Sequence, residues 1–292
     1  MISAATHLYA VIGDPIAHSL SPVMQNWFIK QFDLDAVYTA FHVKHENLQA
    51  CVEGARAMGI NGVNVTVPHK EAILPFVDRA SEQVKLLGAA NTLANDNGTI
   101  TAHVTDPYGF IESLGEHKSR FSGASVLLFG AGGAAKSVAY ALSKLGVGQL
   151  LISDLITPKA VELAKRAKAF GLKDATALEP PLAPIKEIIK HTHIIINATA
   201  VGMHPHQEKS VVAHYDVVGP QHFFYDLVYN PAKTTFLRLA EEKGATIKNG
   251  LNMLIFQGVQ SLRIWTGLDL QLSPSQLSEL QTIMRKKLTV DG

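Results

Sequence analysis

The chain has 292 residues, of which 47% are hydrophobic and 17% are charged, and its 26 basic and 25 acidic side chains give a net charge of +1. This composition argues against a disordered chain and against a basic surface for nucleic acid or anionic membranes, and the length predicts about two domains of ~150 residues each. A single cysteine excludes an internal disulfide and a multi-thiolate metal site, and fits a reducing, cytoplasmic compartment. No apolar run approaches the length of a membrane span, and the N-terminus lacks the basic region of a signal peptide.

The first part of the chain alternates apolar strands with helices. The predicted strands are 8–13, 37–43, 62–67, 91–94 and 99–105, and the predicted helices are 22–32, 46–58, 69–76 and 81–87. Strands joined through helices are parallel neighbours. The turn Asn95-Asp96-Asn97-Gly98 instead predicts an antiparallel hairpin between the last two strands. This region therefore predicts a mixed sheet.

A second series of strands and helices follows a predicted linker at 119–125. Its predicted strands are 126–130, 149–153, 193–197 and 223–227, and its helices are 132–145, 158–170, 233–243, 251–265 and 275–287, with a turn at 179–184. The fold class is α/β, with an N-terminal mixed-sheet α/β domain and a Rossmann domain. We expect domain limits of 1–118 and 119–250, with the helices of 251–292 packing back on the first domain.

A glycine-rich segment stands where a dinucleotide fingerprint is expected, between a predicted strand and a predicted helix. Its residues are Gly130, Ala131, Gly132, Gly133, Ala134 and Ala135. Gly130 permits a tight turn, Gly132 lets the backbone approach a pyrophosphate, and Ala135 is a small residue for helix–strand packing. The pyrophosphate would lie against the N–H groups of the helix N-terminus. The alternative is a glycine-rich turn without a ligand, which the flanking strand and helix disfavour.

The end of the next strand bears on the choice of cofactor. Asp154 stands 24 residues after Gly130, and an acid near this spacing accepts a hydrogen bond from the ribose 2′-OH of NAD, whereas an arginine would accept the 2′-phosphate of NADP. Lys159 and Lys165 lie within the following helix and compensate only partly. The alternative is that Asp154 caps that helix, but Thr157 before Pro158 is the better predicted N-cap.

Three polar clusters of the first part end predicted strands, where open α/β sheets place their ligands. They are residues 13–22 (GDPIAHSLSP), 64–70 (NVTVPHK) and 106–110 (DPYGF). Taken singly, each is expected to be a solvated loop, and Ser21 is also a predicted N-cap before Pro22.

Taken together, these segments resemble the shikimate dehydrogenase family, including its quinate/shikimate dehydrogenase branch. The matching stretches are GDPIAHSLSPVMQN (13–26), GVNVTVPHK (62–70), LGAANTL (87–93), TDPYGF (105–110), GAGGAA (130–135), INATAVGM (196–203), DLVYNPAKTTFL (226–237) and GLNMLIFQGVQSLRIWTG (250–267). They occur in the order of the family and cover nearly the whole chain.

The resemblance implies roles for individual residues. Lys70 and Asp106 form the catalytic pair at the hydroxyl that becomes a ketone. The substrate side comprises Ser19 and Ser21 for the carboxylate, Asn64, Thr66, Asn91 and Gln257 for ring hydroxyls, and Tyr229 lining the cleft. The cofactor side comprises Thr199, Leu227, Gly250 and Met253, besides the glycine-rich segment and Asp154. The active site is then expected in the cleft between the two domains.

Three departures from the family pattern stand out. Val104-Thr105-Asp106-Pro107 replaces the usual Asn-Thr-Asp-Gly, which leaves the geometry beside the catalytic acid open. Gln25-Asn26 replaces His-Asn in the early helix. Ser153-Asp154-Leu155 replaces the Asn-Arg-Thr of NADP-type members, and this Asp-Leu pair is similar to that of the NAD-using quinate/shikimate branch.

The predicted function is reversible oxidation of the 3-hydroxyl of shikimate or quinate, with NAD favoured. The alternatives are the biosynthetic NADP-dependent shikimate dehydrogenase and, more remotely, a non-catalytic sensor of these acids, which would not need both Lys70 and Asp106. The histidine pairs 191/193 and 204/206 lack a third ligand, so no metal site is predicted. The expected partner is a small-molecule substrate rather than nucleic acid or a membrane, and the chain is expected to be a monomer or a homodimer.

Overall fold

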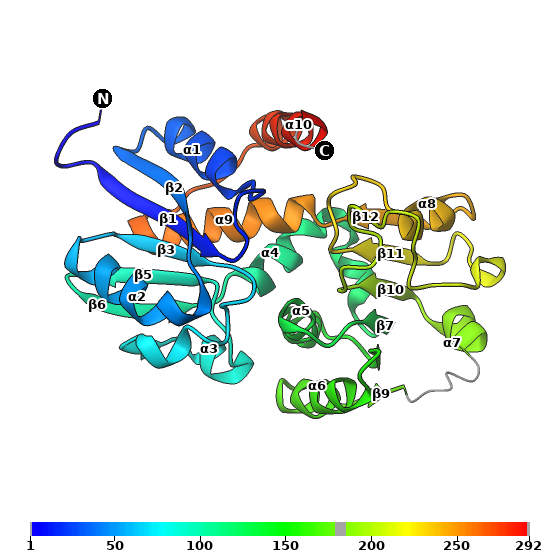
Figure 1. Cartoon of the computed structure of the whole chain (residues 1–292). Coiled ribbons are helices and arrows are strands. Elements are labelled where there is room, and N and C mark those ends of the chain that lie inside the picture. Colours follow the sequence, from blue (N-terminus) through cyan, green and yellow to red (C-terminus); the bar gives the residue numbers. More distant parts are fainter. Residues whose placement is uncertain (1, 179–184, 291–292) are drawn as a thin grey trace. The chain divides into compact units, whose positions relative to one another are not determined.

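The computed structural model describes residues 2–178 and 185–290 and divides into two compact units (Figure 1). The first unit contains Met1–Gly109 and Ile255–Gly292, and the second contains Phe110–Leu254. The chain passes from one unit to the other within two helices, α4 (Asp106–Ser113) and α9 (Leu251–Thr266). None of the described helices combines the length and apolarity needed to cross a bilayer.

The first unit is built on a mixed six-stranded sheet, as predicted. Its strands are β1 (His7–Gly13), β2 (Ala36–His42), β3 (Gly62–Val65), β4 (Arg79–Ala80), β5 (Thr92–Asp96) and β6 (Thr99–His103), in the spatial order β2-β1-β3-β5-β6-β4. β1 pairs in parallel with β2 and β3, whereas β5 is antiparallel to β3 and to β6. Asn97 and Gly98 have positive φ at the turn of the predicted hairpin.

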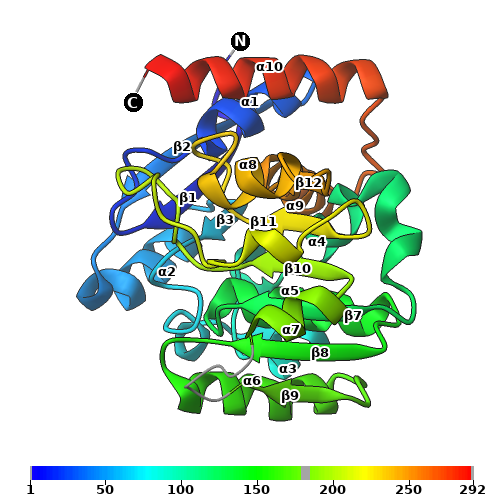
Figure 2. The ribbon, with the colours of Figure 1, turned by 90° about the vertical axis from the view of Figure 1, so that its right-hand side faces the viewer.

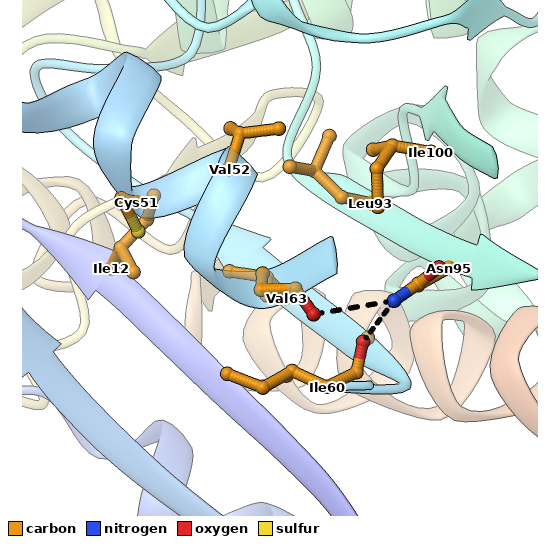
Figure 3. A pocket seen from close by; sticks show the side chains of 10 residues that line it. Ile12, Cys51, Val52, Ile60, Val63, Leu93, Asn95 and Ile100 are labelled. Carbon is orange, nitrogen blue, oxygen red and sulfur yellow. Dashed lines mark hydrogen bonds between the residues drawn. The ribbon is translucent and has the colours of Figure 1, made fainter. Parts of the chain in front are cut away.

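Helices cover both faces of this sheet. The helical segments of the first unit, besides α9, are α1 (Ser21–Gln31), η1 (His45–Asn47), α2 (Leu48–Ala57), η2 (Leu74–Phe76), α3 (Glu82–Leu87) and α10 (Pro274–Val290). On one face, α2 packs over alternate residues of β1, β3 and β5 around a small, mainly apolar cavity of about 10 Å³ (Figure 3). Asn95 lies at its edge and donates to the carbonyl oxygens of Ala55 and Ile60. The space holds at most about one water, so it is a feature of core packing rather than a ligand site.

The opposite face of the sheet is covered by α9. Trp265 of α9 donates from Nε1 to the carbonyl oxygen of Leu93 at 2.8 Å and stacks on Tyr9 with ring centroids 4.7 Å apart. A Cβ on Gly62 would overlap the Trp265 ring, so glycine is required there. Helix α1 packs on α9 through Gln25, whose Nε2 donates to the Gly258 carbonyl. Figure 2 shows α10 lying along α1.

The second unit is a Rossmann domain, as predicted. Its strands are β7 (Ser125–Phe129), β8 (Gln149–Ser153), β9 (Ala175–Ala177), β10 (Ile194–Asn197), β11 (Phe223–Asp226) and β12 (Thr246–Asn249). They are all parallel, in the order β12-β11-β10-β7-β8-β9, which is the doubly wound order of dinucleotide-binding sheets. The other helical segments are η3 (Gly115–Phe121), α5 (Gly133–Lys144), α6 (Thr157–Ala169), α7 (Ile185–His191), η4 (Tyr215–Val217) and α8 (Thr235–Glu241).

Aromatic residues fill the core on both faces of this second sheet. On the face covered by α7 and α8, Phe224 packs against Phe236 with ring centroids 5.0 Å apart. On the other face, Tyr225 packs edge-on against Phe110 of α4. Figure 1 shows α5 and α6 on the face of this sheet opposite to α7 and α8.

Several predicted elements differ from the structure. The expected helix 69–76 is a series of turns ending in η2, because Pro75 cannot donate to a helical ladder. The strand predicted to Val67 ends at Val65. The sequence did not predict β4, β9, β12, α4 and α7, and the first three are strands of four residues or fewer without a clear apolar pattern. The predicted turn 179–184 lies outside the described residues.

Candidate active site

The predicted catalytic pair is brought into direct contact within the first unit. Lys70 lies within the turns after β3, and Asp106 is the first residue of α4. Lys70 Nζ lies 2.5 Å from Asp106 Oδ2, and the two side chains are 22% and 10% exposed. Pro107 occupies the first turn of α4, where proline is tolerated, so the departure from the usual family sequence leaves the acid at a helix N-terminus rather than in a loop.

Asn91 holds the other oxygen of that carboxylate. Its Nδ2 donates to Asp106 Oδ1 at 2.9 Å and to Gln257 Oε1 of α9 at 3.2 Å. Its Oδ1 accepts the backbone N–H of Thr105 at 2.8 Å, which fixes the orientation of the amide because a backbone N–H can only donate. Asn91 is 3% exposed, so most of its polar capacity is used in holding Asp106 in place.

Asn64 lies on β3 directly opposite Thr92 of β5 and joins the same network. Its Nδ2 donates to the Asn91 carbonyl oxygen at 3.1 Å, to Thr92 Oγ1 at 3.1 Å and to Ser261 Oγ of α9 at 3.0 Å. Thr92 and Ser261 are fully buried, and their hydroxyls lie 2.8 Å apart. A buried polar group is costly unless it is hydrogen-bonded, so this network of buried hydroxyls and amides is held together as a unit.

The residues predicted for the substrate carboxylate lie where α1 begins. Helix α1 starts at Ser21 with Leu20 as its N-cap and without a side-chain cap, so the prediction that Ser21 caps the helix is wrong. The Ser21 backbone N–H instead donates to Ser19 Oγ at 3.2 Å, and both serines are half-buried. The Ser21 hydroxyl is therefore not used by the helix. Thr66, also half-buried, follows β3 and packs over Gly13.

Sequence reasoning missed four members of this network: Tyr38, Thr92, Thr105 and Ser261. Strand alternation places Thr92 on the same face as Asn64 once the pairing of β3 with β5 is known, and helical spacing places Ser261 one turn after Gln257. Nothing in the local sequence distinguishes these hydroxyls from ordinary core residues, since the pairing of distant elements brings them together.

In the second unit, the glycine-rich segment lies between β7 and α5, as predicted. Gly130 has a φ of +104°, and a Cβ there would come within 2.9 Å of the Ala198 carbonyl oxygen. A methyl group on Gly132 or Gly133 would meet no side chain, and no backbone from another part of the chain, within 4 Å. The first N–H groups of α5 have no partner within the helix and carry its positive dipole end. This open cradle of backbone at a helix N-terminus fits a pyrophosphate.

Asp154 follows β8 and contacts the glycine-rich segment. Its Oδ2 accepts the Ala131 N–H and its Oδ1 accepts the Ile156 N–H, both at 2.8 Å. Helix α6 begins at Thr157 with Ile156 as its N-cap, so the prediction of Thr157 as the N-cap is wrong. Each carboxylate oxygen retains a second lone pair, so Asp154 can still accept a hydrogen bond from a ribose hydroxyl.

The other predicted cofactor positions lie at or after the ends of β10, β11 and β12 in the second unit. Thr199 donates from Oγ1 to Asn197 Oδ1 at 2.7 Å. A Cβ on Gly250 would overlap the carbonyl oxygen of Leu227, so the two backbones touch. Met253 is buried in the first turns of α9. Tyr229, assigned to the substrate by the resemblance, also lies in this unit, in the loop after β11, where burial raises its pKa.

Behind these positions lies a buried carboxyl group that the sequence did not single out. Asp226, at the end of β11, accepts hydrogen bonds from Asn197 Nδ2, from the Val228 N–H and from Thr234 Oγ1. Burial raises its pKa from 3.8 to about 7, although these hydrogen bonds act in the opposite direction. Asp226 thus ties the loop after β10 to the loop after β11. Within the described residues, no group of three or more His, Cys, Asp or Glu side chains is arranged to hold a metal ion.

A doubly wound sheet with a glycine-rich turn at a helix N-terminus defines a dinucleotide-binding protein. Comparisons with known proteins agree and go further. Residues 11–93 match the model of the shikimate dehydrogenase substrate binding domain, and residues 113–229 match that of shikimate/quinate 5-dehydrogenase. Shikimate dehydrogenase (NADP(+)) of Methanothermobacter thermautotrophicus is 40% identical over 92% of this chain and 94% of its own length.

Solved structures show the same relationship. Shikimate 5-dehydrogenase from Listeria monocytogenes, in complex with shikimate and NAD, is 32% identical with a TM-score of 0.87, over 97% of this chain and 98% of that one. Quinate dehydrogenase from Corynebacterium glutamicum, in complex with NAD, is 30% identical with a TM-score of 0.85, over 98% and 99%. The chain belongs to the shikimate/quinate dehydrogenase family and is an oxidoreductase that acts on a CH–OH group with a nicotinamide cofactor.

Proposed function

We propose that this enzyme catalyses the reversible oxidation of the 3-hydroxyl of shikimate or quinate and favours NAD over NADP. The contact between Lys70 and Asp106 carries the proposal for the chemistry, because this reaction needs a proton acceptor and a cation beside the reacting oxygen. Residues 1–118 with the helices of 251–292 would bind the acid, and residues 119–250 would bind the cofactor.

The pair supplies what alcohol oxidation requires of the protein. The hydroxyl loses its proton to the Lys70–Asp106 pair, and the carbon–hydrogen bond breaks with both electrons leaving as hydride, so that a ketone remains. The cofactor, when bound, supplies the hydride acceptor. The ammonium of Lys70 stabilises negative charge on the reacting oxygen, and Asn91 holds Asp106 in place. At this distance a proton can pass between the two side chains, so either can be the formal base.

The remaining side chains suit a polyhydroxylated acid. Amide and hydroxyl groups of Asn64, Thr66, Asn91 and Gln257 offer both donors and acceptors for ring hydroxyls. Ser19 and Ser21 offer donors for a carboxylate. A substrate that lacks one of these hydroxyls would leave a polar group of the site unpaired, which strongly disfavours it. Shikimate and quinate share the carboxylate and the reacting hydroxyl, and both remain candidates.

Asp154 supports the proposal for NAD. A 2′-phosphate in its place would meet a carboxylate held by the Ala131 and Ile156 N–H groups, whereas a 2′-OH would find an acceptor. The second candidate is the NADP-dependent biosynthetic reaction, the reduction of 3-dehydroshikimate. It is favoured by the name of the Methanothermobacter relative, which is an NADP(+) enzyme.

Initial rates with two cofactors and two acids test these proposals, using wild-type enzyme, Asp154→Asn and the control Asp174→Asn. Asp174 is an exposed aspartate of the same domain. We expect wild-type kcat/KM to be higher with NAD than with NADP. Asp154→Asn should lower the ratio of these two kcat/KM values by about tenfold, because the repulsion between the carboxylate and the 2′-phosphate is lost. The control should keep the wild-type ratio. A wild-type preference for NADP above tenfold would overturn the role of Asp154, and no turnover of either acid would overturn the substrate assignment.

A further inference from the structure

A buried tyrosine is hydrogen-bonded to one of the side chains that the resemblance assigns to the substrate. Tyr38 lies on β2 and is 4% exposed. Its hydroxyl donates to Asn64 Oδ1 at 2.7 Å. Burial raises the pKa of Tyr38 well above its usual value of 10. The phenol therefore stays protonated and remains a donor.

The contacts of Asn64 fix which way its amide faces. The carbonyl oxygen of Asn91 can only accept a hydrogen bond, so the Asn64 atom that lies 3.1 Å from it must be the amide nitrogen. The two hydrogens of that nitrogen already face three acceptors, on Asn91, Thr92 and Ser261. The opposite atom, Oδ1, then faces Tyr38. One lone pair of Oδ1 accepts the phenol proton, and the second lone pair can still accept a hydrogen bond.

We propose that Tyr38 is a positioning residue of the substrate site: its hydroxyl holds the Asn64 amide so that Asn64 presents its carbonyl oxygen as an acceptor to a substrate hydroxyl. This inference rests on the proposed function. It adds a specific direction for the hydrogen bond between Asn64 and the substrate.

The neighbouring strand offers a matched control. Tyr9 of β1 is paired in register with Tyr38, is 3% exposed, and stacks on the same Trp265 ring. Among the described residues, no hydrogen bond to the Tyr9 hydroxyl is found. Tyr9→Phe thus removes a hydroxyl from the same aromatic cluster without touching Asn64, and Tyr38→Phe removes the positioning hydroxyl with the ring retained.

Steady-state kinetics and calorimetric binding of the acid substrate to wild-type enzyme, Tyr38→Phe and Tyr9→Phe test the proposal. We expect Tyr38→Phe to raise KM and Kd for the acid by about tenfold, the upper range for one hydrogen bond. Its kcat should stay within about twofold of wild type and its cofactor KM unchanged, since Lys70 and Asp106 are not in contact with Tyr38. Tyr9→Phe should match wild type in all of these constants.

A second measurement separates positioning from general loosening of the core. With 4-deoxy and 5-deoxy analogues of the acid, the penalty of Tyr38→Phe should disappear for the one analogue that lacks the hydroxyl bound by Asn64. In an Asn64→Ala background, Tyr38→Phe should add little, because the interaction is already lost.

An unchanged KM in Tyr38→Phe, or equal changes in both tyrosine variants, would overturn the positioning role while the proposed function stands. A penalty that persists equally with every analogue and in the Asn64→Ala background would overturn it as well. A wild-type enzyme that neither binds nor oxidises either acid would overturn both proposals.

Discussion

The two units build their candidate binding sites from different chemical groups. In the first unit, buried side chains from β2, β3, β5, α4 and α9 form one hydrogen-bonded network that ends in the Lys70–Asp106 pair. In the second unit the candidate site consists mainly of backbone, with glycine after β7 and after β12 and with first-turn N–H groups of α5 that have no partner within the helix. A network of side chains distinguishes one small molecule from another, whereas a backbone cradle recognises a phosphate group common to many cofactors. Substitutions should therefore alter chemistry in the first unit and local structure in the second.

The largest expected effect is at Lys70 and Asp106, the proposed catalytic pair of the first unit. Lys70→Ala should lower kcat by about 10²–10⁴-fold, the range attributed to a positioned proton-transfer group, with a much smaller change in KM. Steady-state kinetics with saturating cofactor measure both constants. The control is Lys85→Ala, which removes an exposed lysine of the same unit that pairs with Glu82. An unchanged kcat with a raised KM would make Lys70 a binding residue only.

A backbone contact is the corresponding test in the second unit. Gly250→Ala would force a methyl group into the Leu227 carbonyl. Because the main chain must move to make room, we expect a loss of about 1–3 kcal/mol in the free energy of unfolding, together with weaker cofactor binding. Thermal unfolding and cofactor titration measure the two effects. The control, Gly54→Ala in α2, meets only Met58 Cε at 3.6 Å and should leave stability equal or slightly higher. A Gly250→Ala enzyme with wild-type stability would contradict the close approach.

The same difference explains what could be predicted from the sequence. The glycine-rich turn, its flanking strand and helix, and the acid after the next strand are local patterns, and the structure places Gly130 and Asp154 at the ends of adjacent strands, joined through the Ala131 N–H. The mixed sheet of the first unit also followed from a local signal, the Asn97-Gly98 turn. Short edge strands such as β4 and β12 were missed because two to four residues carry too little periodicity.

The hydrogen-bonded network of the first unit could not be predicted from local sequence patterns. The resemblance named Asn64, Asn91 and Gln257, but Tyr38, Thr92 and Ser261 became visible only through contacts between residues 26 to 197 positions apart in the chain. Both predicted helix caps, at Ser21 and Thr157, were wrong for a related reason. The backbone N–H of Ser21 and that of Ile156 are each bound by a side chain two residues earlier, and each helix begins without a side-chain cap.

The smallest expected effect concerns the buried carboxyl of the second unit. Because the pKa of Asp226 is raised to about 7 in the folded protein, the folded state binds a proton more readily than the unfolded state between about pH 4 and pH 7. Stability should therefore fall as pH rises through this window. Asp226→Asn removes the titration but retains an acceptor for Asn197 and Val228. Between pH 5 and pH 8 the Tm of this variant should therefore fall by several degrees less than that of wild type, since ~1 kcal/mol corresponds to about 2–4 °C.

An exposed aspartate of the same unit supplies a control of opposite sign. Lys186 beside Asp216 lowers the pKa of that carboxyl, so its contribution is present at neutral pH and is lost as pH falls. Asp216→Asn should leave the decline in Tm between pH 5 and pH 8 as in wild type, with any change confined to more acidic pH. If the Tm values of wild type and of both variants rise by the same amount from pH 5 to pH 8, Asp226 is ionised throughout this range. The hydrogen bonds from Asn197, Val228 and Thr234 would then outweigh the cost of its burial.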